Sequence, residues 1–343
     1  RIPGLKMTVV AADGQYVHPV TVEELRIAAA ETFDVIVEPS GQDAYTIFAQ
    51  DMGRTGFARG TLAVRHGLAA PVPASDPRPL LTMQDMAHGD HAGHGVAAMM
   101  DHGAEGGCVA TMKPGAEGGC SAAMKHAGEG GCGAAMKHAS EGGCGAAMHG
   151  DASADAHAGH GGPSGVGAVV HPPSEDGNPL VDMQSSPTGP RLDDPGIGLR
   201  DNGRRVLAYA DLRSLFDDPD GRDPGREVQL HLTGHMEKFS WSFDGIPFAS
   251  AEPLRLNYGE RMRIVLVNDT MMQHPIHLHG LWSDLEDADG AFQVRKHTID
   301  MPPGTRRSYR VRADALGRWA YHCHLLYHME GGMMREVRVE ERA

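Results

Sequence analysis

The chain has 343 residues, a formal net charge of −14 at pH 7 and 41% hydrophobic residues. This acidic balance argues against nucleic acid as a partner and favours the attraction of cations. No apolar run approaches the ~20 residues that a membrane-spanning helix needs, so we expect no membrane span.

The first 66 residues show the patterning of β-strands. The run "MTVVAADGQ" ends in a turn signal, and "FDVIVEPSG" repeats the same pattern. The chain opens on "RIPGLK", which leads directly into the first of these runs. We therefore expect the sequence to be part of a longer protein, and we interpret residues 1–66 as the last strands of an all-β domain.

Residues 67–172 have a different composition. No Phe, Tyr or Trp occurs between Phe57 and Tyr209, so much of this interval lacks the side chains that build a core. The Pro-rich run "GLAAPVPASDPRPLL" is followed by low-complexity sequence. Between positions 83 and 160 lie nine of the 21 His and eight of the 19 Met. We predict a spacer and a flexible insert rich in Met, His and Cys.

A tandem repeat of period twelve lies inside this insert, as in "AEGGCSAAMKHA". Each unit carries a Cys and, four residues later, a Met. Three interpretations remain open: accessory binding of Cu(I) by soft thiol and thioether ligands, two disulfides in an oxidising compartment, or duplication without a fixed role. The residues concerned are Cys108, Met112, Cys120, Met124, Cys132, Met136, Cys144 and Met148.

Residues 173–343 return to strand patterning. Strand-like runs such as "REVQLHLTG", "PLRLNYGERMRIVLVND", "TRRSYRVRA" and "MREVRVEE" are separated by Gly, Asp and Pro turns. Short strands at this spacing are typical of a β-sandwich or barrel. We expect Arg306, Arg307 and Arg310 to form a solvated strand face.

Two histidine-containing runs in this region, "MQHPIHLHGLW" and "AYHCHLL", have matching alternation. Side chains alternate between the faces of a strand, so His274 projects opposite to the two later histidines of its run. Cys323 likewise projects opposite to the histidines that flank it. If the strands are adjacent, one face carries His274 with Cys323. The other face then carries four imidazoles: His277, His279, His322 and His324.

The first of these sites can be completed locally, by His328 five residues after Cys323 and Met333 ten residues after it. Two imidazoles, a thiolate and a weak axial thioether are the ligands of a blue-copper centre. The second site has no thiolate, which suits copper that handles oxygen species. Because His322 and His324 flank Cys323, a short covalent path joins the two sites.

Zinc is the main alternative metal. The run "HPIHLHG", or His324 with His328 on a helix, could hold zinc. Neither possibility explains the cysteine, the axial methionine and the matched faces together, so we favour copper. The nearby Met329 and Met334 fit either packing or a methionine-lined approach to the site.

Acidic residues close to these runs have two interpretations. They could hold an incoming cuprous ion, or they could belong to a solvated loop of an acidic protein, which we favour. The residues are Asp284, Glu286, Asp287 and Glu330.

The runs "HPIHLHG" and "HCHLLYHMEGGM" resemble the two C-terminal copper motifs of the multicopper oxidases. "HPIHLHGLWSDLED", "FQVRKHTIDMPPG" and "WSFDG" resemble the periplasmic copper-resistance branch, and "RIPGLKMTVVAADGQ" resembles the end of its middle domain. The resemblance implies an all-β fold, with a cupredoxin-like Greek-key β-sandwich at residues 173–343. A low-complexity insert at 67–172 would join it to the end of a second cupredoxin-like domain at 1–66.

Carried over by position, the resemblance implies a type 1 copper held by His274, Cys323, His328 and Met333. It assigns His277 to the type 2 copper, and the type 3 pair to His279, His322 and His324. Cys323, His322 and His324 would be the catalytic residues. The full enzyme would hold four coppers, oxidise Cu(I) or small aromatic donors, reduce dioxygen, and serve copper resistance in the periplasm.

The chain departs from the family pattern in one respect. The family uses eight histidines around its trinuclear cluster, four of them from two HxH motifs in the first domain, and this chain has no such upstream pair. We expect a preceding domain of the same protein, or a complementing chain, to supply them. Two rival functions remain: periplasmic copper sequestration without turnover, and a simple blue-copper carrier, which would not need the four extra histidines.

Overall fold

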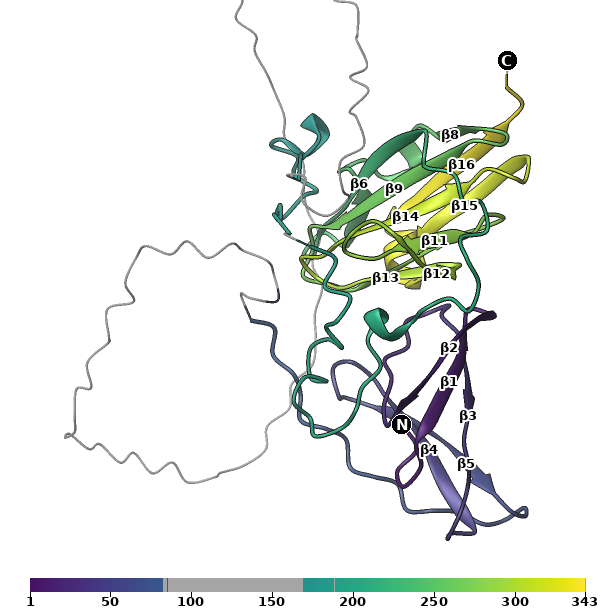
Figure 1. Cartoon of the computed structure of the whole chain (residues 1–343). Coiled ribbons are helices and arrows are strands. Elements are labelled where there is room, and N and C mark those ends of the chain that lie inside the picture. The colour runs from purple at the N-terminus through teal and green to yellow at the C-terminus, as the bar shows by residue number, and fades with distance from the viewer. Residues whose placement is uncertain (83–84, 86–168, 188, 343) are drawn as a thin grey trace, which may run out of the picture. The chain divides into compact units, whose positions relative to one another are not determined.

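The computed structural model describes residues 1–82, 85, 169–187 and 189–342, which are mostly β-strands and loops (Figure 1). The predicted N-terminal strands are present as β1 (Met7–Ala12) and β3 (Phe33–Ile36). The cysteines and methionines of the tandem repeat lie outside the described residues, so the three interpretations of the repeat remain predictions.

Residues 1–66 form two small antiparallel sheets. One has the order β2-β1-β3, with β2 at Gln15–Val22, and the other pairs β4 (Ala44–Gln50) with β5 (Phe57–Ala63). Asp13 and Gly14 link β1 to β2 with φ angles of 49° and 72°. An Asp-Gly pair adopts these positive φ values readily, which explains the tight hairpin at the predicted turn.

Residues 226–340 contain two larger sheets (Figure 1). The five-stranded sheet has the order β13-β10-β15-β16-β8, and the six-stranded sheet has the order β12-β11-β14-β9-β6-β7. The first sheet comprises β8 (Leu254–Asn257), β10 (His274–Leu278), β13 (Thr298–Met301), β15 (Gly317–Cys323) and β16 (Met334–Glu340). The second comprises β6 (Arg226–His235), β7 (Ser240–Phe243), β9 (Arg261–Asn268), β11 (Ser283–Glu286), β12 (Phe292–Lys296) and β14 (Arg306–Arg312).

Short helices complete the described chain. The α-helix α1 spans Leu326–Glu330, and 3₁₀ helices lie at η2 (Pro173–Glu175), η3 (Tyr209–Asp211) and η4 (Phe248–Ser250). Within the described ranges, none of the helices is both long and apolar enough to cross a bilayer.

The core lies between the sheets and follows from strand alternation. In β16 the buried positions Arg335, Val337 and Val339 alternate with half-buried ones. The central strand β9 pairs with β6 on one side and β14 on the other, and it is buried along nearly its whole length. In the five-stranded sheet β10 and β15 are neighbours, so the two histidine-containing runs lie side by side.

A buried lysine joins the two structured parts of the sequence. The Lys296 ammonium lies 3.0 Å from Asp13 Oδ2 and 3.2 Å from Glu31 Oε1, and the lysine side chain is fully buried. Burial lowers the pKa of Lys296, but the two carboxylates outweigh this effect and raise it. The lysine is therefore charged and compensated inside the protein, as burial of an ion requires.

The prediction of a solvated acidic loop is wrong for two of its residues. Asp284 is 0% exposed and Glu286 is 1% exposed, and both lie in strand β11. Arg295 Nε lies 2.7 Å from Asp284 Oδ1, and Arg263 Nε lies 2.9 Å from Glu286 Oε2. Because arginines on other strands of the same sheet pair with these carboxylates, neither acidic group is available to an incoming metal ion.

The predicted solvated arginine face is wrong for Arg307, which is 1% exposed. Its Nε donates to the carbonyl of Pro190 at 3.1 Å, and its guanidinium lies 4.4 Å from the centre of the Tyr209 ring. The alternation of the strand was visible in the sequence, but the loop that covers this face was not.

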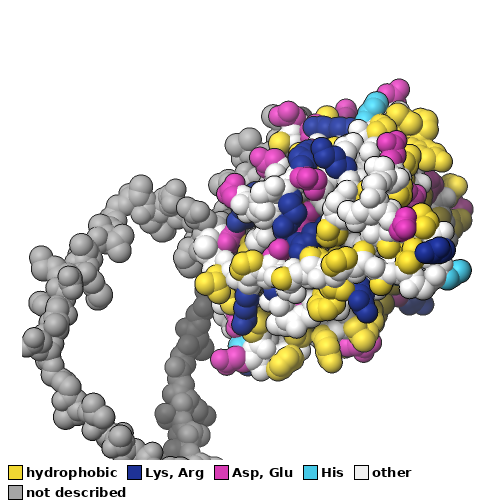
Figure 2. Space-filling view, turned by 90° about the horizontal axis from the view of Figure 1, so that it is seen from below, with side chains coloured by type: hydrophobic (Ala, Val, Ile, Leu, Met, Phe, Trp, Pro, Cys, Tyr) yellow, Lys and Arg dark blue, Asp and Glu magenta, His cyan; other side chains and the backbone are white. Residues whose placement is uncertain are grey.

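Hydrophobic side chains are exposed among charged ones on the face shown in Figure 2. A largely apolar groove is lined by residues of the first part of the chain, which include Ile2, Phe33 and Ile47, and also by Ile197 and Leu199. The large exposed apolar side chains of residues 1–66 are Tyr16, Ile27, Ile36, Ile47, Met52, Phe57 and Val64.

Candidate metal centre

The register of β10 and β15 produces the two predicted faces. The strands are antiparallel neighbours, with His277 opposite His322 and Ile276 opposite Cys323. Opposed residues share a face, and residues two apart on a strand share a face as well. His274 therefore lies on the same face as Cys323, and His277 lies on the face of His322.

Three metal-ligating groups converge on the first face. Cys323 Sγ lies 3.6 Å from His274 Nδ1 and 3.7 Å from His328 Nδ1, and the two Nδ1 atoms are 2.9 Å apart. All three residues are buried, and Met333 is 0% exposed. The Cys323 amide donates to the Met333 carbonyl at 3.1 Å, and the Met333 amide donates to the His328 carbonyl at 2.9 Å.

Helix α1 and the glycines after it bring His328 into this cluster. The His328 ring stacks on Trp241, with ring centres 4.4 Å apart and planes at 23°. A Cβ atom on Gly331 would lie 2.7 Å from Trp241 Cε3 and 2.9 Å from the Tyr327 carbonyl oxygen. Only glycine allows this close approach, which explains the glycine at position 331 between the predicted ligands His328 and Met333.

Thr270 orients His274, and sequence reasoning did not identify it. The Thr270 hydroxyl lies 2.7 Å from His274 Nε2 and 2.9 Å from Asn268 Oδ1. When the hydroxyl donates to Asn268, it accepts the Nε2 proton of His274. This leaves Nδ1 as the unprotonated atom that faces Cys323, the usual arrangement for a metal-binding histidine.

Burial shifts the protonation of this cluster toward neutral forms. It lowers the pKa of His328 to about 4 and that of His274 well below its usual value, and it raises the pKa of Cys323 to about 12. Without a cation the site holds neutral imidazoles and a thiol, and a bound metal would replace the thiol proton. Two imidazoles, a thiol and a buried thioether fit copper.

Four histidines gather on the opposite face. The ring centres of His277 and His279 are 4.5 Å apart, and those of His277 and His324 are 5.8 Å apart. His279 Nε2 and His322 Nε2 lie 3.0 Å from each other. These contacts bring together all four of the imidazoles that alternation assigned to one face.

Backbone carbonyls orient two of these rings. His322 Nδ1 lies 2.9 Å from the Cys323 carbonyl oxygen, and His277 Nδ1 lies 2.7 Å from the His297 carbonyl oxygen. With Nδ1–H donating in each case, Nε2 is left to bind a metal. Burial also lowers the pKa of His277 to about 4, which keeps this imidazole neutral.

A fifth histidine, His297, lies beside this group and was not predicted. Its ring centre is 5.1 Å from that of His277, and its Nδ1 is 2.9 Å from Thr298 Oγ1. A single histidine in "RKHTID" belongs to no recognisable spacing, so only the pairing of β10 with β13 could reveal this neighbour.

In the described part of the chain, two groups of three or more His, Cys, Asp or Glu side chains have ligand atoms that all lie within 4.8 Å of one another. One is the group of His274, Cys323 and His328. The other consists of His171, Glu175, His231 and Asp269, and nothing in the sequence analysis had singled it out.

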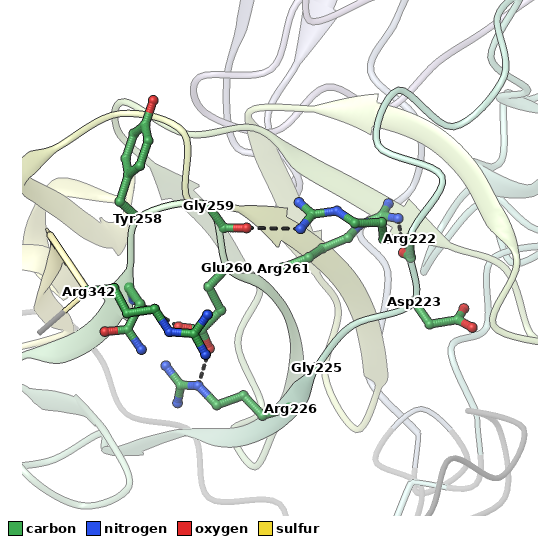
Figure 3. Close-up of a pocket in the computed structure, with 10 residues that line it drawn as sticks. Arg222, Asp223, Gly225, Arg226, Tyr258, Gly259, Glu260, Arg261 and Arg342 are labelled. Carbon is green, nitrogen blue, oxygen red and sulfur yellow. Dashed lines mark hydrogen bonds and ion pairs between the residues drawn. The ribbon is translucent and has the colours of Figure 1, made fainter.

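A surface pocket near the β8–β9 turn offers a different environment (Figure 3). Its lining includes four arginines and contains none of the predicted metal ligands. Arg226 already pairs with Glu260, and Arg222 donates to the Gly259 carbonyl at 3.0 Å (Figure 3). Two of the four arginines that line the pocket therefore already have acidic or carbonyl partners within it.

Two models of the multicopper oxidase family match the chain, one over residues 221–343 and the other over residues 1–66. The chain is 71% identical over 343 residues to copper resistance protein A of Pseudomonas syringae pv. tomato. It is 65% identical over 341 residues to copper resistance protein A of Escherichia coli. Each alignment covers 99% of this chain and 53% of the relative, so the chain spans about half the length of these relatives.

The fold is similar to that in the crystal structure of Fet3p, a multicopper oxidase that functions in iron import. The TM-score is 0.51 at 12% identity, and the match covers 99% of this chain and 52% of that chain. At this identity the likeness concerns the fold alone, and it confirms the predicted all-β, cupredoxin-like architecture.

Proposed function

We propose a copper-dependent oxidase function for this chain because it belongs to the multicopper oxidase family. The full protein would couple one-electron oxidation of Cu(I) or a small aromatic donor to the reduction of dioxygen, in the service of copper resistance. The observation that carries this proposal is the buried convergence of His274, Cys323 and His328.

The two faces of the β10–β15 pair have separate roles in this proposal. The type 1 copper ligands are His274, Cys323, His328 and Met333. The type 2 ligand is His277, and the type 3 ligands are His279, His322 and His324. Bound copper would supply one-electron transfer on the first face and dioxygen chemistry on the second.

Residues of this chain orient and bury the ligands of the first site and connect that site covalently to the second. Thr270 holds the tautomer of His274, and burial excludes water from the thiol of Cys323. Cys323 is bonded through the backbone to His322 and His324, which makes it the shortest covalent connection between the faces. We therefore assign catalytic roles to these three residues.

The division of the chain into residues 1–66, 67–172 and 173–343 is part of the proposal. We propose that a preceding domain or a complementing chain supplies the remaining trinuclear histidines and covers the apolar groove that residues 1–66 line together with Ile197 and Leu199. The half-length match to the relatives and the exposed Ile36, Ile47 and Phe57 support this view. A periplasmic location is inferred from the family.

The test is the visible and EPR spectrum of the copper-loaded chain, with oxygen uptake followed during Cu(I) addition. An intense thiolate-to-copper absorption that disappears in Cys323→Ser, but persists in the matched variant Cys108→Ser, would support the type 1 site. Absorption without oxygen uptake would fit a chain that holds half of the trinuclear ligands. If no such absorption develops, the type 1 assignment is wrong.

Copper sequestration is the second candidate, favoured by the His and Met enrichment between residues 83 and 160. Deletion of residues 83–160 separates the two functions. Sequestration predicts that most bound copper is lost with the deletion, whereas the oxidase proposal predicts that the blue absorption is retained.

A further inference from the structure

His171, Glu175, His231 and Asp269 form a cluster that the copper sites do not use. His171 Nδ1 lies 2.8 Å from Glu175 Oε2 and 3.5 Å from Asp269 Oδ2. His231 Nδ1 lies 2.6 Å from Asp269 Oδ2 and 3.7 Å from Glu175 Oε1. Each imidazole thus faces both carboxylates.

These separations are short enough for the four residues to bind one metal ion. Four nitrogen and oxygen ligands at about 2.0–2.1 Å from Zn²⁺ lie roughly 3.3 Å from one another. The four nitrogen–oxygen distances, which involve both oxygens of Glu175, run from 2.6 to 3.7 Å. One ligand atom from each of the four residues lies within 4.8 Å of the other three. The two shortest distances, from His231 to Asp269 and from His171 to Glu175, are those of hydrogen-bonded pairs. Hydrogen bonding draws these pairs together in the absence of a cation.

Burial makes a cation favourable at this point. Glu175, His231 and Asp269 are 3%, 1% and 1% exposed. When the two imidazoles bind a metal ion as neutral ligands, the two carboxylates contribute two negative charges, which a dication would balance. A third carboxylate, Asp244, accepts from the His231 amide at 2.8 Å, and Arg335 lies 3.9 Å from its other oxygen.

Two buried atoms of the cluster, Glu175 Oε1 and His231 Nε2, have no hydrogen-bond partner among the described residues. Glu175 Oε1 is directed toward His231, so a cation between them would satisfy it. An unpaired buried carboxylate oxygen is costly otherwise. The unpaired Glu175 oxygen therefore indicates that the cluster binds a ligand.

Neighbouring groups hold the other ligand atoms in place. The Ser185 amide and hydroxyl donate to Asp269 Oδ1 at 2.8 and 2.7 Å. His171 Nε2 lies 3.0 Å from the Ser185 carbonyl oxygen, and Gln184 Nε2 donates to Glu175 Oε2 at 3.2 Å. In metal sites, the ring nitrogen of a histidine that does not bind the metal commonly donates to a carbonyl oxygen, and the carboxylate ligands accept hydrogen bonds from neighbouring donors.

The four residues come from separate parts of the fold. His171 and Glu175 flank the two prolines of "HPPSE", whose fixed φ angles help to hold the spacing of four. His231 lies in β6, and Asp269 follows β9 directly. A shared ion would bridge the start of the C-terminal described region to the central strands of the six-stranded sheet.

We propose a structural Zn²⁺ site, separate from the copper clusters, that fastens residues 171–175 to β6 and the end of β9. It is a closed site with two imidazole and two carboxylate ligands. The ligands are His171, Glu175, His231 and Asp269.

The experiment measures Zn²⁺ retained per chain after chelation, reloading with Zn²⁺ and removal of weakly bound metal. His171→Gln and, separately, Glu175→Gln are compared with wild type. His18→Gln is the matched control, since it removes an exposed histidine far from these residues in sequence. We expect the site variants to retain one Zn²⁺ fewer per chain than wild type and the control.

A second readout is thermal unfolding, in which Zn²⁺ should raise the Tm of wild type and of His18→Gln by more than that of the site variants. The blue absorption of Cys323 after copper loading serves as an independent check that each variant is folded. Equal Zn²⁺ retention by folded variants and wild type would overturn the proposal and leave a buried ion-pair network. If one variant does not fold, the other decides the comparison.

Discussion

The Thr270 hydroxyl and His274 Nε2 are hydrogen-bonded at 2.7 Å, and both residues are buried. Thr270 is four residues before His274, in the turn between β9 and β10. The threonine therefore controls which nitrogen of a proposed copper ligand carries the proton.

Thr270→Val should weaken the type 1 site. Loss of the hydroxyl leaves the Nε2–H without its acceptor and frees the ring to rotate, so we expect copper affinity to fall about 10- to 100-fold. The measurement is a copper titration followed by the blue absorption. Thr270→Ser retains the hydroxyl and is expected to bind like wild type, and an unchanged affinity in Thr270→Val would contradict the role of Thr270.

Gly331→Ala should disturb the same site from the other side. The added Cβ would lie 2.7 Å from Trp241 Cε3, so either the tryptophan or the His328 turn must move. We expect a weaker or shifted blue absorption, together with a loss of about 1–3 kcal/mol of stability, as is typical of overpacking. Gly56→Ala, whose Cβ would meet nothing within 4 Å, is the control. Identical spectra for the two variants would rule out this packing argument.

Lys296→Met should destabilise the folded chain strongly. It leaves Asp13 and Glu31 buried without the cation that lies 3.0 and 3.2 Å from them. Removing one partner of a buried ion pair typically costs about 3–5 kcal/mol. Urea unfolding measures the change, with the exposed Lys6→Met as control. A loss no greater than that of the control would show that water or another group compensates the two carboxylates.

Asp194 should contribute to acid sensitivity. Burial raises its pKa, but hydrogen bonds from Arg200 and the Gly196 amide, with the charge of Arg191, lower it to about 2. A carboxyl whose folded pKa lies below its unfolded value of about 3.9 stabilises the protein above that value, and the contribution disappears as pH falls toward 2.

For this group the contribution is on the order of 1–2 kcal/mol at neutral pH. Urea unfolding of Asp194→Asn should therefore show lower stability at pH 7 and a shallower loss between about pH 4 and pH 2. Asp193→Asn changes an exposed neighbour and is the control. Parallel acid profiles for Asp194→Asn and wild type would disprove the contribution.

Local patterns explain what could be predicted. Strand runs, the Asp-Gly turn and the two matched faces depend on neighbours one or two residues apart, and each is present in the fold. The grouping of His274 with Cys323 followed from alternation, once the two strands were taken as adjacent. The contacts of Thr270 and Trp241 to the histidines were not predicted, because the first depends on the turn between β9 and β10 and the second on the packing of α1 against β7.

The sequence by itself determined the chemistry that is available: a cysteine between two histidines, five further ligands at strand or turn spacing, and a family signature at both ends. The tertiary structure decided which distant groups meet. Strand order placed arginines beside Asp284 and Glu286, and it brought His171 and Glu175 to His231 and Asp269. The physical reason is that alternation is encoded in the neighbouring residues, whereas contacts between distant residues arise only when the sheets pack.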